Sequence, residues 1–175
     1  MVHGMRMDSH ISYVNGGGGW RDSAQRFALL PLRVFLGVTF IYAGLDKLTD
    51  SAFLHASGPG SIGEQMHGVR NISAIPALVD LALKSPAGFG YAIALGELAV
   101  GIGTLIGLLA RIAAVGGMLI SLSLWLTVSW STHPYYLGND LAYLMAWLPL
   151  VLAGAPVFSA DALLATRRRA RRGLA

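Results

Sequence analysis

Long apolar stretches separated by more polar connections dominate the pattern of hydrophobic and polar positions along this chain of 175 residues. The stretch 89–110 is about 22 residues long, or about 33 Å as an α-helix, which is enough to cross the roughly 30 Å hydrocarbon core of a bilayer. Similar stretches cover residues 27–48, 112–130 and 139–154. The pattern therefore predicts an all-α fold, an integral membrane four-helix bundle.

One carboxylate, Glu97, lies near the middle of the apolar stretch 89–110. An ionisable group at that depth is costly in lipid, so we expect Glu97 to face the bundle interior and to have a charged partner there. The depth of each residue in its helix leaves an axial offset of roughly 9 Å between Glu97 and Arg33 of the first stretch. A long arginine side chain can span most of that gap, and we predict that Arg33 and Glu97 are coupled in the bundle core.

Small residues recur at every fourth position in the second and third apolar stretches. Such spacing leaves one face of a helix smooth, so that the backbone of another helix can approach it closely. Because a short turn joins the two stretches, we expect them to run antiparallel, side by side, with their small faces in contact. The small residues are Ala99, Gly103 and Gly107 in the second stretch, and Ala113, Gly117 and Ser121 in the third.

The connection 49–88 is too long for a plain hairpin and is expected to hold short helices of its own. Ser61 and Glu64 have the spacing of a capping box, which predicts a helix that ends at about Arg70. The run 75–83 has apolar residues at helical spacing, which predicts an amphipathic helix that lies on the membrane or caps the bundle.

Positive charges are distributed unevenly between the connections, and this distribution predicts the orientation in the membrane. The loop 131–138 contains no lysine or arginine, whereas Arg111 lies in the opposite turn. Because lysine and arginine mark cytoplasmic loops, both termini are expected to be cytoplasmic and the connection 49–88 extracytoplasmic. The other arginines that support this orientation are Arg21, Arg26, Arg167, Arg168, Arg169, Arg171 and Arg172.

The chain is expected to consist of one transmembrane domain between two tails. Residues 1–26 are polar and glycine-rich, which is typical of a disordered cytoplasmic tail. Residues 27–158 form the transmembrane domain, and residues 159–175 form an arginine-rich cytoplasmic tail. Arginines directly after a hydrophobic segment are more typical of an anchor facing anionic lipid than of a nucleic-acid surface. The expected partner is therefore the lipid bilayer, and no nucleic acid.

The composition supports a membrane protein and excludes several kinds of chemistry. The chain is 54% hydrophobic and 13% charged, against about 25% charged residues in ordinary soluble domains. It contains no cysteine, which excludes disulfides, thiolate catalysis and cysteine metal sites in this chain. The glycines of the segment 101–107 lack the spacing of a dinucleotide-binding loop and lie inside an apolar helix. We therefore expect no metal site and no covalently bound cofactor.

Three further polar residues lie at predicted helix ends, where two interpretations are open. Asp46 and Lys47 close the first apolar stretch. They are either a solvated helix terminus with a snorkelling lysine or part of a substrate-binding or quinone-binding site. Asp140 opens the fourth stretch, where it either caps the helix or belongs to the same site.

Three phrases of the sequence resemble the DoxX family: RVFLGVTFIYAGLDKL, GELAVGIGTLIGLLARIAAVGG and NDLAYLMAWLPLVLAG. The Gly-Leu-x-Lys ending of the first helix, the Gly-Glu pair of the second and the arginine before the third occur in the family order. The long insert after the first helix resembles the DoxD-like branch, which is related to the membrane subunit of thiosulfate:quinone oxidoreductase. By match of motif, the resemblance implies roles for Arg33, Lys47, Glu97, Arg111 and Asp140.

The resemblance implies a multi-pass protein of the bacterial plasma membrane, a redox-associated subunit that passes electrons from a reduced donor, such as a sulfur compound, to membrane quinone. Glu97 is then the candidate proton relay with Arg33 as its partner, and Lys47 or Arg33 stabilises a developing anion. A bound quinone and either a soluble redox partner or a homo-oligomer are the expected associations. The alternatives are a non-catalytic membrane scaffold that recruits a soluble enzyme, and a small-molecule or proton carrier.

Overall fold

The computed structural model describes residues 24–25, 27–155, 157–161, 163–164 and 166–167. Within these residues the chain is all-helical, with six α-helices, one 3-10 helix and no strand. The all-α prediction is therefore confirmed for this part of the chain. Most of the two predicted tails, 1–26 and 159–175, lies outside the described residues.

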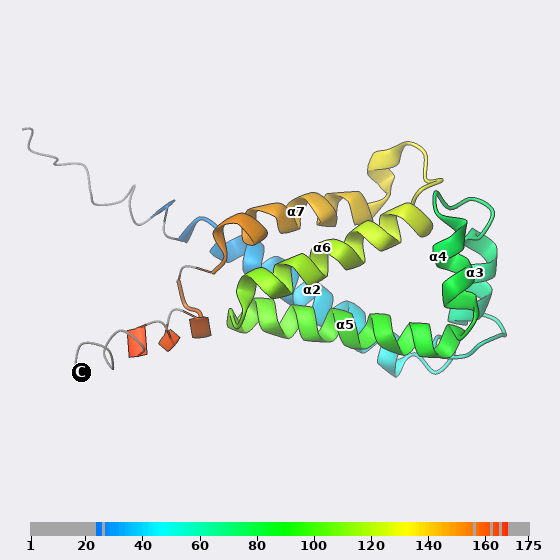
Figure 1. The fold of residues 1–175 in the computed structure, drawn as a ribbon, viewed down its shortest axis with the longest axis horizontal. Coiled ribbons are helices and arrows are strands. Elements are labelled where there is room, and N and C mark those ends of the chain that lie inside the picture. The colour runs from blue at the N-terminus through cyan, green and yellow to red at the C-terminus, as the bar shows by residue number, and fades with distance from the viewer. Residues whose placement is uncertain (1–23, 26, 156, 162, 165, 168–175) are drawn as a thin grey trace, which may run out of the picture.

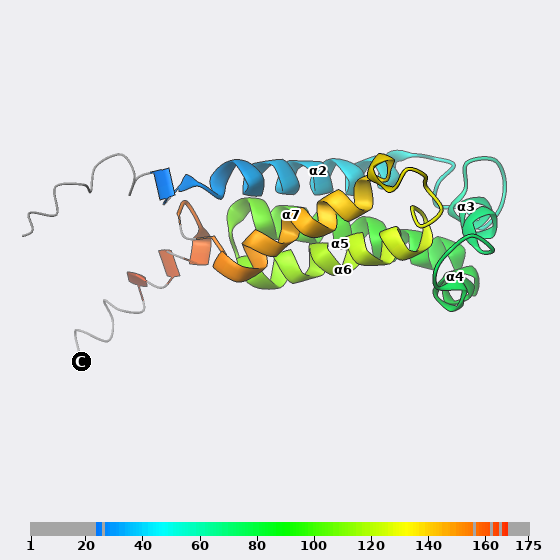
Figure 2. The ribbon, with the colours of Figure 1, turned by 90° about the horizontal axis from the view of Figure 1, so that it is seen from above.

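Four long helices extend along the longest axis of the molecule and lie beside one another (Figure 1 and Figure 2). They are α2 (Leu30–Thr49), α5 (Pro86–Ile106), α6 (Ala110–Thr127) and α7 (Asn139–Ala153). The predicted boundaries differ most for α5. This helix begins early because Pro86 occupies its first turn, where a missing N–H is tolerated. It ends at Ile106, because the next residue, Gly107, has a left-handed φ of 71°.

Two short helices, α3 (Ile62–Val69) and α4 (Pro76–Leu83), lie across one end of the long helices, which we call the α3/α4 end (Figure 1). The start signal at Ser61 is confirmed, since its hydroxyl oxygen accepts a hydrogen bond from the N–H of Glu64 at 3.2 Å. The Glu64 carboxylate accepts from the N–H of Gly60 rather than from that of Ser61. A small core of their own holds these helices together, made of Phe53, Ile62, Met66, Val79 and Ala82.

Close backbone contact joins α2 to α5, which is the most extensive helix pairing in the described chain. A Cβ added to Gly44 would lie 2.7 Å from the carbonyl oxygen of Ala94, and one added to Gly101 would lie 2.7 Å from the backbone nitrogen of Ile41. Real Cβ atoms do not approach other atoms so closely, so both positions require glycine. The short distance between these helices allows side chains on their facing sides to meet.

The predicted contact between the small faces of α5 and α6 is confirmed at one place and wrong at two others. A Cβ added to Gly103 would lie 3.3 Å from the Cβ of Ala113, so these two residues do meet. Gly117 instead faces the ring of Trp147 on α7, and Ala99 is exposed. Small residues permit a close approach but do not specify the neighbour, and here the indole ring fills the space beside α6.

An apolar core fills the middle of the four long helices. It consists of Leu36, Phe40, Ala114, Trp147 and Leu150, all of them buried. The rings of Phe40 and Trp147 pack edge to face with their centroids 4.9 Å apart. Along α2, this core lies between Arg33 near the start of the helix and Lys47 near its end.

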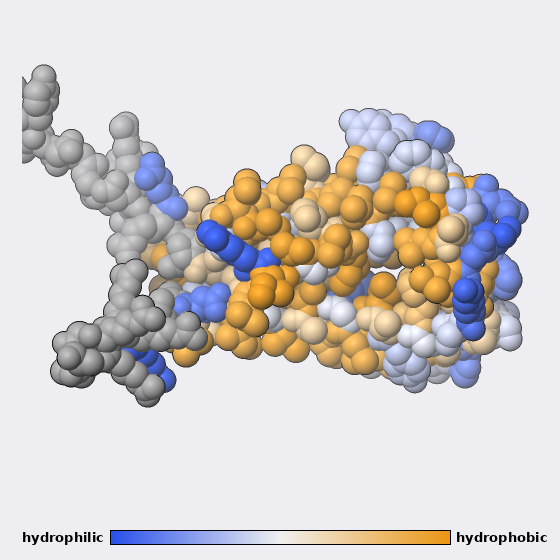
Figure 3. Space-filling view, in the orientation of Figure 1, coloured by the Kyte–Doolittle hydropathy of each residue, from blue (hydrophilic) through white to orange (hydrophobic). Residues whose placement is uncertain are grey.

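The outer surface of the long helices is largely hydrophobic, whereas hydrophilic residues gather at the α3/α4 end (Figure 3). Two of the helices, α5 and α6, are long and apolar enough to cross a membrane. The shorter α7 is also apolar. Exposed apolar area of this extent is typical of a protein whose helices face lipid.

Candidate functional site

An ion pair between Lys47 and Glu97 joins the last turn of α2 to the middle of α5. The Lys47 Nζ atom lies 2.8 Å from Oε2 of Glu97 and 3.1 Å from Oε1, so one ammonium group donates to both carboxylate oxygens. The side chain of Glu97 is only 4% exposed, and that of Lys47 is 24% exposed. The expectation that Glu97 faces the interior and has a charged partner is therefore confirmed.

The direction of the two helices explains why these side chains meet. In an α-helix, each Cα–Cβ bond tilts toward the N-terminus of the helix. Because α2 ends at the α3/α4 end and α5 begins there, the Lys47 side chain leans inward along the bundle and the Glu97 side chain leans toward it. The two residues thus approach each other from levels that differ by only about a turn of helix.

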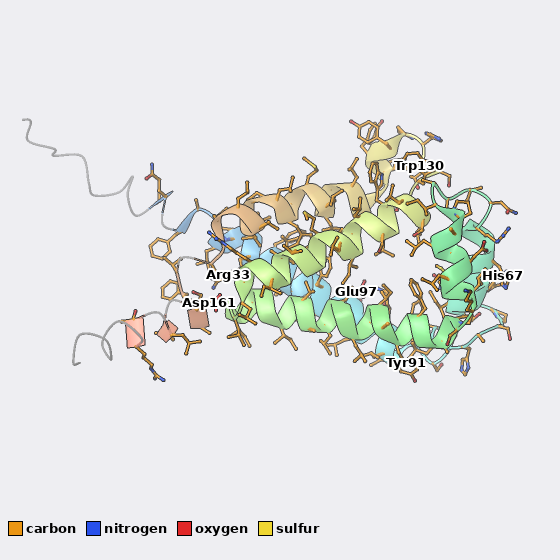
Figure 4. All side chains as sticks on the ribbon, in the orientation of Figure 1. Arg33, His67, Tyr91, Glu97, Trp130 and Asp161 are labelled. Atoms are coloured by element: carbon orange, nitrogen blue, oxygen red, sulfur yellow. The ribbon has the colours of Figure 1, made fainter. Side chains whose placement is uncertain are left out.

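The predicted coupling of Arg33 with Glu97 is wrong. Gly44 packs between Ala94 and Leu98, and Gly37 between Gly101 and Leu105, so Arg33 and Glu97 lie about 10 residues, or about 15 Å, apart along the helix axes. The prediction assumed a helix from residue 27, but α2 begins at Leu30, which places Arg33 in its first turn. Figure 4 shows the two residues at different levels, with Arg33 nearer to Asp161.

Arg33 instead binds the segment that follows α7. Its Nη1 donates to the carbonyl oxygen of Val157 at 2.6 Å, and its Nη2 donates to that of Phe158 at 2.7 Å. The residue is 5% exposed. Since its side chain also leans toward the N-terminus of α2, away from Glu97, Arg33 fastens the chain at the end opposite to α3 and α4.

Asp140, in the first turn of α7, lies close to the ion pair. Its carboxylate accepts a hydrogen bond from the hydroxyl of Ser129, and it is near enough to Lys47 and Glu97 for the charges to interact. We call Lys47, Glu97, Asp140 and Ser129 the charged cluster. Asp46, the remaining predicted site residue of this region, is exposed and lies outside the cluster.

The charged cluster contains two carboxyl groups and one ammonium group, which contacts Glu97 directly. Glu97 is the single charged residue of α5, Asp140 is that of α7, and Arg111 at the far end is that of α6. No other charged residue of these three helices therefore lies near the cluster. An ammonium group can donate to an oxygen of a bound molecule, and a carboxyl group can give or accept a proton, so the arrangement suits proton transfer to an oxygen-bearing group.

An opening between α5 and α6 is visible on the side toward α4, with hydrophilic atoms at its edge (Figure 3). Glu97 lies at about this level of the molecule in the same view (Figure 4). The two helices diverge from their short turn toward the α3/α4 end, which leaves this space between them (Figure 1).

The remaining predicted residues, Gly103, Gly107 and Arg111, lie near the turn between α5 and α6. A Cβ on Gly107 would lie 2.4 Å from the Cβ of Ser159, so glycine is needed both for the left-handed turn and for this contact. Arg111 is exposed, and its side chain covers Gly154. These residues contribute to the packing of the turn and are not brought to the charged cluster.

Sequence reasoning missed two polar residues that the fold uses. Ser129 bonds Asp140 from a position 11 residues earlier in the chain, in the loop after α6. Asp161 accepts hydrogen bonds from the N–H groups of Leu109 and Ala110, both at 2.9 Å, and so caps the start of α6. Neither contact has a sequence signal, because each partner lies on another element.

A pocket of about 550 Å³ lies at the α3/α4 end beside the charged cluster. Ser129 contributes to its wall, together with Trp125, Trp130, His133 and Tyr135. The aromatic residues are of the kind that lies at membrane–water interfaces. Among the described residues, no group of three or more histidine, aspartate or glutamate side chains could hold a metal ion.

Comparison with known protein families gives one match. The family model described as DoxX matches residues 28–130, which is more than half of the chain. This range includes α2 through α6 and therefore both members of the ion pair, whereas Asp140 and α7 lie beyond it. No curated protein and no solved structure matches the chain.

Proposed function

Since this chain belongs to the DoxX family of membrane proteins, we propose that α2, α5, α6 and α7 cross the bacterial plasma membrane as a four-helix bundle. The length and apolar character of α5 and α6, and the apolar surface of the long helices, support this proposal. Both termini are placed in the cytoplasm, because arginines gather near the end of the chain and the loop 131–138 has none. The α3/α4 end is then extracytoplasmic.

Within this bundle, we propose that the charged cluster binds the headgroup of a membrane quinone. The observation that carries the proposal is the buried ion pair of Lys47 with Glu97, with Asp140 beside it, inside otherwise apolar helices. Ionisable groups in such surroundings are costly and mark functional sites in membrane proteins. The lateral opening between α5 and α6 would admit a headgroup that is delivered by lipid (Figure 3).

The chemistry of the cluster suits the reduction of a quinone to a quinol. Each electron that the ring accepts is matched by a proton on a ring oxygen. Lys47 would donate to the oxygen on which negative charge develops, and Glu97 and Asp140 would supply the protons. The electrons come from a reduced donor such as thiosulfate, in keeping with the DoxD-like resemblance, through a soluble redox partner or a second subunit. The chain is then the quinone-linked subunit of an oxidoreductase.

The test is mass spectrometry of the organic extract of detergent-purified protein, compared between the wild type and Glu97→Gln. We expect stoichiometric quinone in the wild type and its loss in the variant. Glu64→Gln, at an exposed position of α3, is the matched control and should keep the quinone. Quinone-free wild-type protein that is properly folded would contradict the proposal and would favour the scaffold, whereas donor-independent uptake of a solute by vesicles would favour the carrier.

A further inference from the structure

Polar groups extend from the α3/α4 end toward the buried ion pair. The first of them lies at the wall of the pocket of about 550 Å³ described above, where the Ser129 hydroxyl donates to the carboxylate of Asp140. Asp140 lies within range of the charges of Lys47 and Glu97. Lys47 itself is 24% exposed at this end of the bundle. A hydroxyl and two carboxyl groups in sequence can pass a proton inward from water.

The opposite direction is filled by the apolar core. Leu36, Phe40 and Leu150 lie between the charged cluster and the turn of α5 into α6. Two polar atoms are buried at this depth without a hydrogen-bond partner in the described residues, Oγ1 of Thr104 and Nε1 of Trp147. The indole N–H is a donor only, so it cannot accept and pass on a proton. Within the part of the chain that the structure describes, neither atom is hydrogen-bonded to the ion pair or to Arg33.

Arg33 adds an electrostatic obstacle beyond the core. Its guanidinium group is buried and held on the carbonyl oxygens of Val157 and Phe158. A fixed, buried positive charge repels protons and other cations that approach from that side. Arg33 lies about 15 Å along the axis from Glu97, so it opposes entry from the far end without neutralising the carboxylate.

We propose that the Lys47–Glu97 pair exchanges protons with one side of the membrane only, the side of α3 and α4, through Asp140 and Ser129. The charged groups that face Glu97 from the neighbouring helices are Lys47 on α2 and Asp140 on α7, while α6 contributes Arg111 only at the far end. The cluster is then a one-sided proton relay and not a transmembrane proton path. The inference does not require that the bound molecule be a quinone.

The experiment uses the full-length protein, reconstituted in one orientation in phosphatidylcholine vesicles without quinone, with the pH set separately inside and outside. A hydrophobic carbodiimide, which adds to protonated carboxyl groups in apolar surroundings, is applied, and peptide mass spectrometry measures the rate of labelling at Glu97. We expect this rate to rise when the pH is lowered on the α3/α4 side. Lowering the pH on the other side should leave it unchanged.

Variants test the route. Asp140→Asn and Ser129→Ala should slow the response to a pH step about tenfold, and Ser129→Thr, which keeps the hydroxyl, should restore it. Ser131→Ala removes another hydroxyl from the wall of the same pocket and should respond like the wild type. Thr104→Val should also respond like the wild type, because Thr104 lies in the direction that the apolar core fills, away from α3 and α4.

Three results would overturn the inference. The first is equal sensitivity of Glu97 to the pH on both sides, which would indicate a through path. The second is sensitivity only to the side opposite to α3 and α4. The third is no labelling of Glu97 at any pH in folded protein, because the relay requires this carboxyl group to bind a proton. Since the vesicles contain no quinone, a one-sided response would stand even if the quinone proposal failed.

Discussion

The ammonium group of Lys47 lies 2.8 Å from the carboxylate of Glu97, although the two residues are 50 positions apart in the sequence. This contact connects the end of α2 with the middle of α5 and places a charge pair inside apolar helices. Asp140, whose charge interacts with the pair, comes from a third helix, α7. The site is therefore assembled by the packing of the bundle and depends on it.

Removing one member of the ion pair should destabilise the protein. Glu97→Leu leaves the Lys47 ammonium group without its partner, and we expect the free energy of unfolding to fall by about 2 kcal/mol, less than for a fully buried pair because Lys47 is partly exposed. The double variant Lys47→Met with Glu97→Leu should recover most of this loss. Reversible unfolding in mixed detergent measures all of these values. Additive effects of the two substitutions would contradict a direct pair.

Replacing Arg33 should loosen the segment after α7 without disturbing the ion pair. Arg33→Lys can keep only one of the hydrogen bonds to Val157 and Phe158, because lysine lacks the planar fork of donors. We expect faster amide hydrogen exchange in residues 157–161, and unchanged exchange around Glu97. Arg111→Lys, at an exposed position, is the control. Faster exchange around Glu97 in Arg33→Lys would contradict this prediction, because it would indicate that Arg33 and Glu97 are coupled.

Gly44→Ala should separate α2 from α5. The new Cβ would lie 2.7 Å from the carbonyl oxygen of Ala94 and 2.9 Å from the backbone nitrogen of Leu98, and backbone atoms cannot move aside cheaply. We expect a loss of stability of about 1–3 kcal/mol in the same unfolding measurement. At Gly96→Ala the new Cβ would make an ordinary contact of 3.5 Å with Ile120, so this variant should be as stable as the wild type.

The α3/α4 end should loosen at low pH. The hydrogen bond from Arg70 lowers the pKa of the Asp80 carboxyl below its ordinary value of 3.8, and the Arg70 Nη2 to Asp80 Oδ2 distance is 3.0 Å. A group with a lowered pKa in the folded state stabilises it above the ordinary pKa, and this contribution is lost as the pH falls through the lowered value. The protection of amide hydrogens in α3 and α4, relative to their intrinsic exchange rates at each pH, should therefore decrease below pH 3.8.

The variant Asp80→Asn is the control for this pH dependence. It lacks the titrating group, so its exchange in α3 and α4 should change less with pH over the same interval. Because both side chains are exposed, the effect should be confined to these two helices. A drop in the stability of the whole protein with the same midpoint would contradict this assignment.

Several parts of the fold could be predicted from local patterns. The apolar runs identify the long helices, because lipid-facing helices need continuous apolar length. The start of α3 was predicted from Ser61 and Glu64, since a capping box involves only neighbouring residues. Boundaries were less accurate: α2 begins three residues later than predicted, α5 begins three residues earlier, and α5 ends four residues earlier.

The partners of the charged residues could not be predicted in the same way. Glu97 had two basic candidates on α2, Arg33 and Lys47, and the choice depends on how far the two helices are shifted along each other. Contacts at Gly37 and Gly44 set that shift. Ser129 and Asp161 could not be found at all, because each bonds a residue on a different element.

The sequence by itself determined that this protein consists of long apolar helices, that Glu97 is a buried charge in need of a partner, and that the chain resembles the DoxX family. These properties depend on residue type and on spacing within one helix. Only the tertiary structure decided that Lys47 is that partner and that Arg33 fastens the chain at the opposite end. The physical reason is that two features of the packing determine which side chains meet: the direction of the Cα–Cβ bonds and the glycine contacts between antiparallel helices. No single segment of the sequence encodes these features.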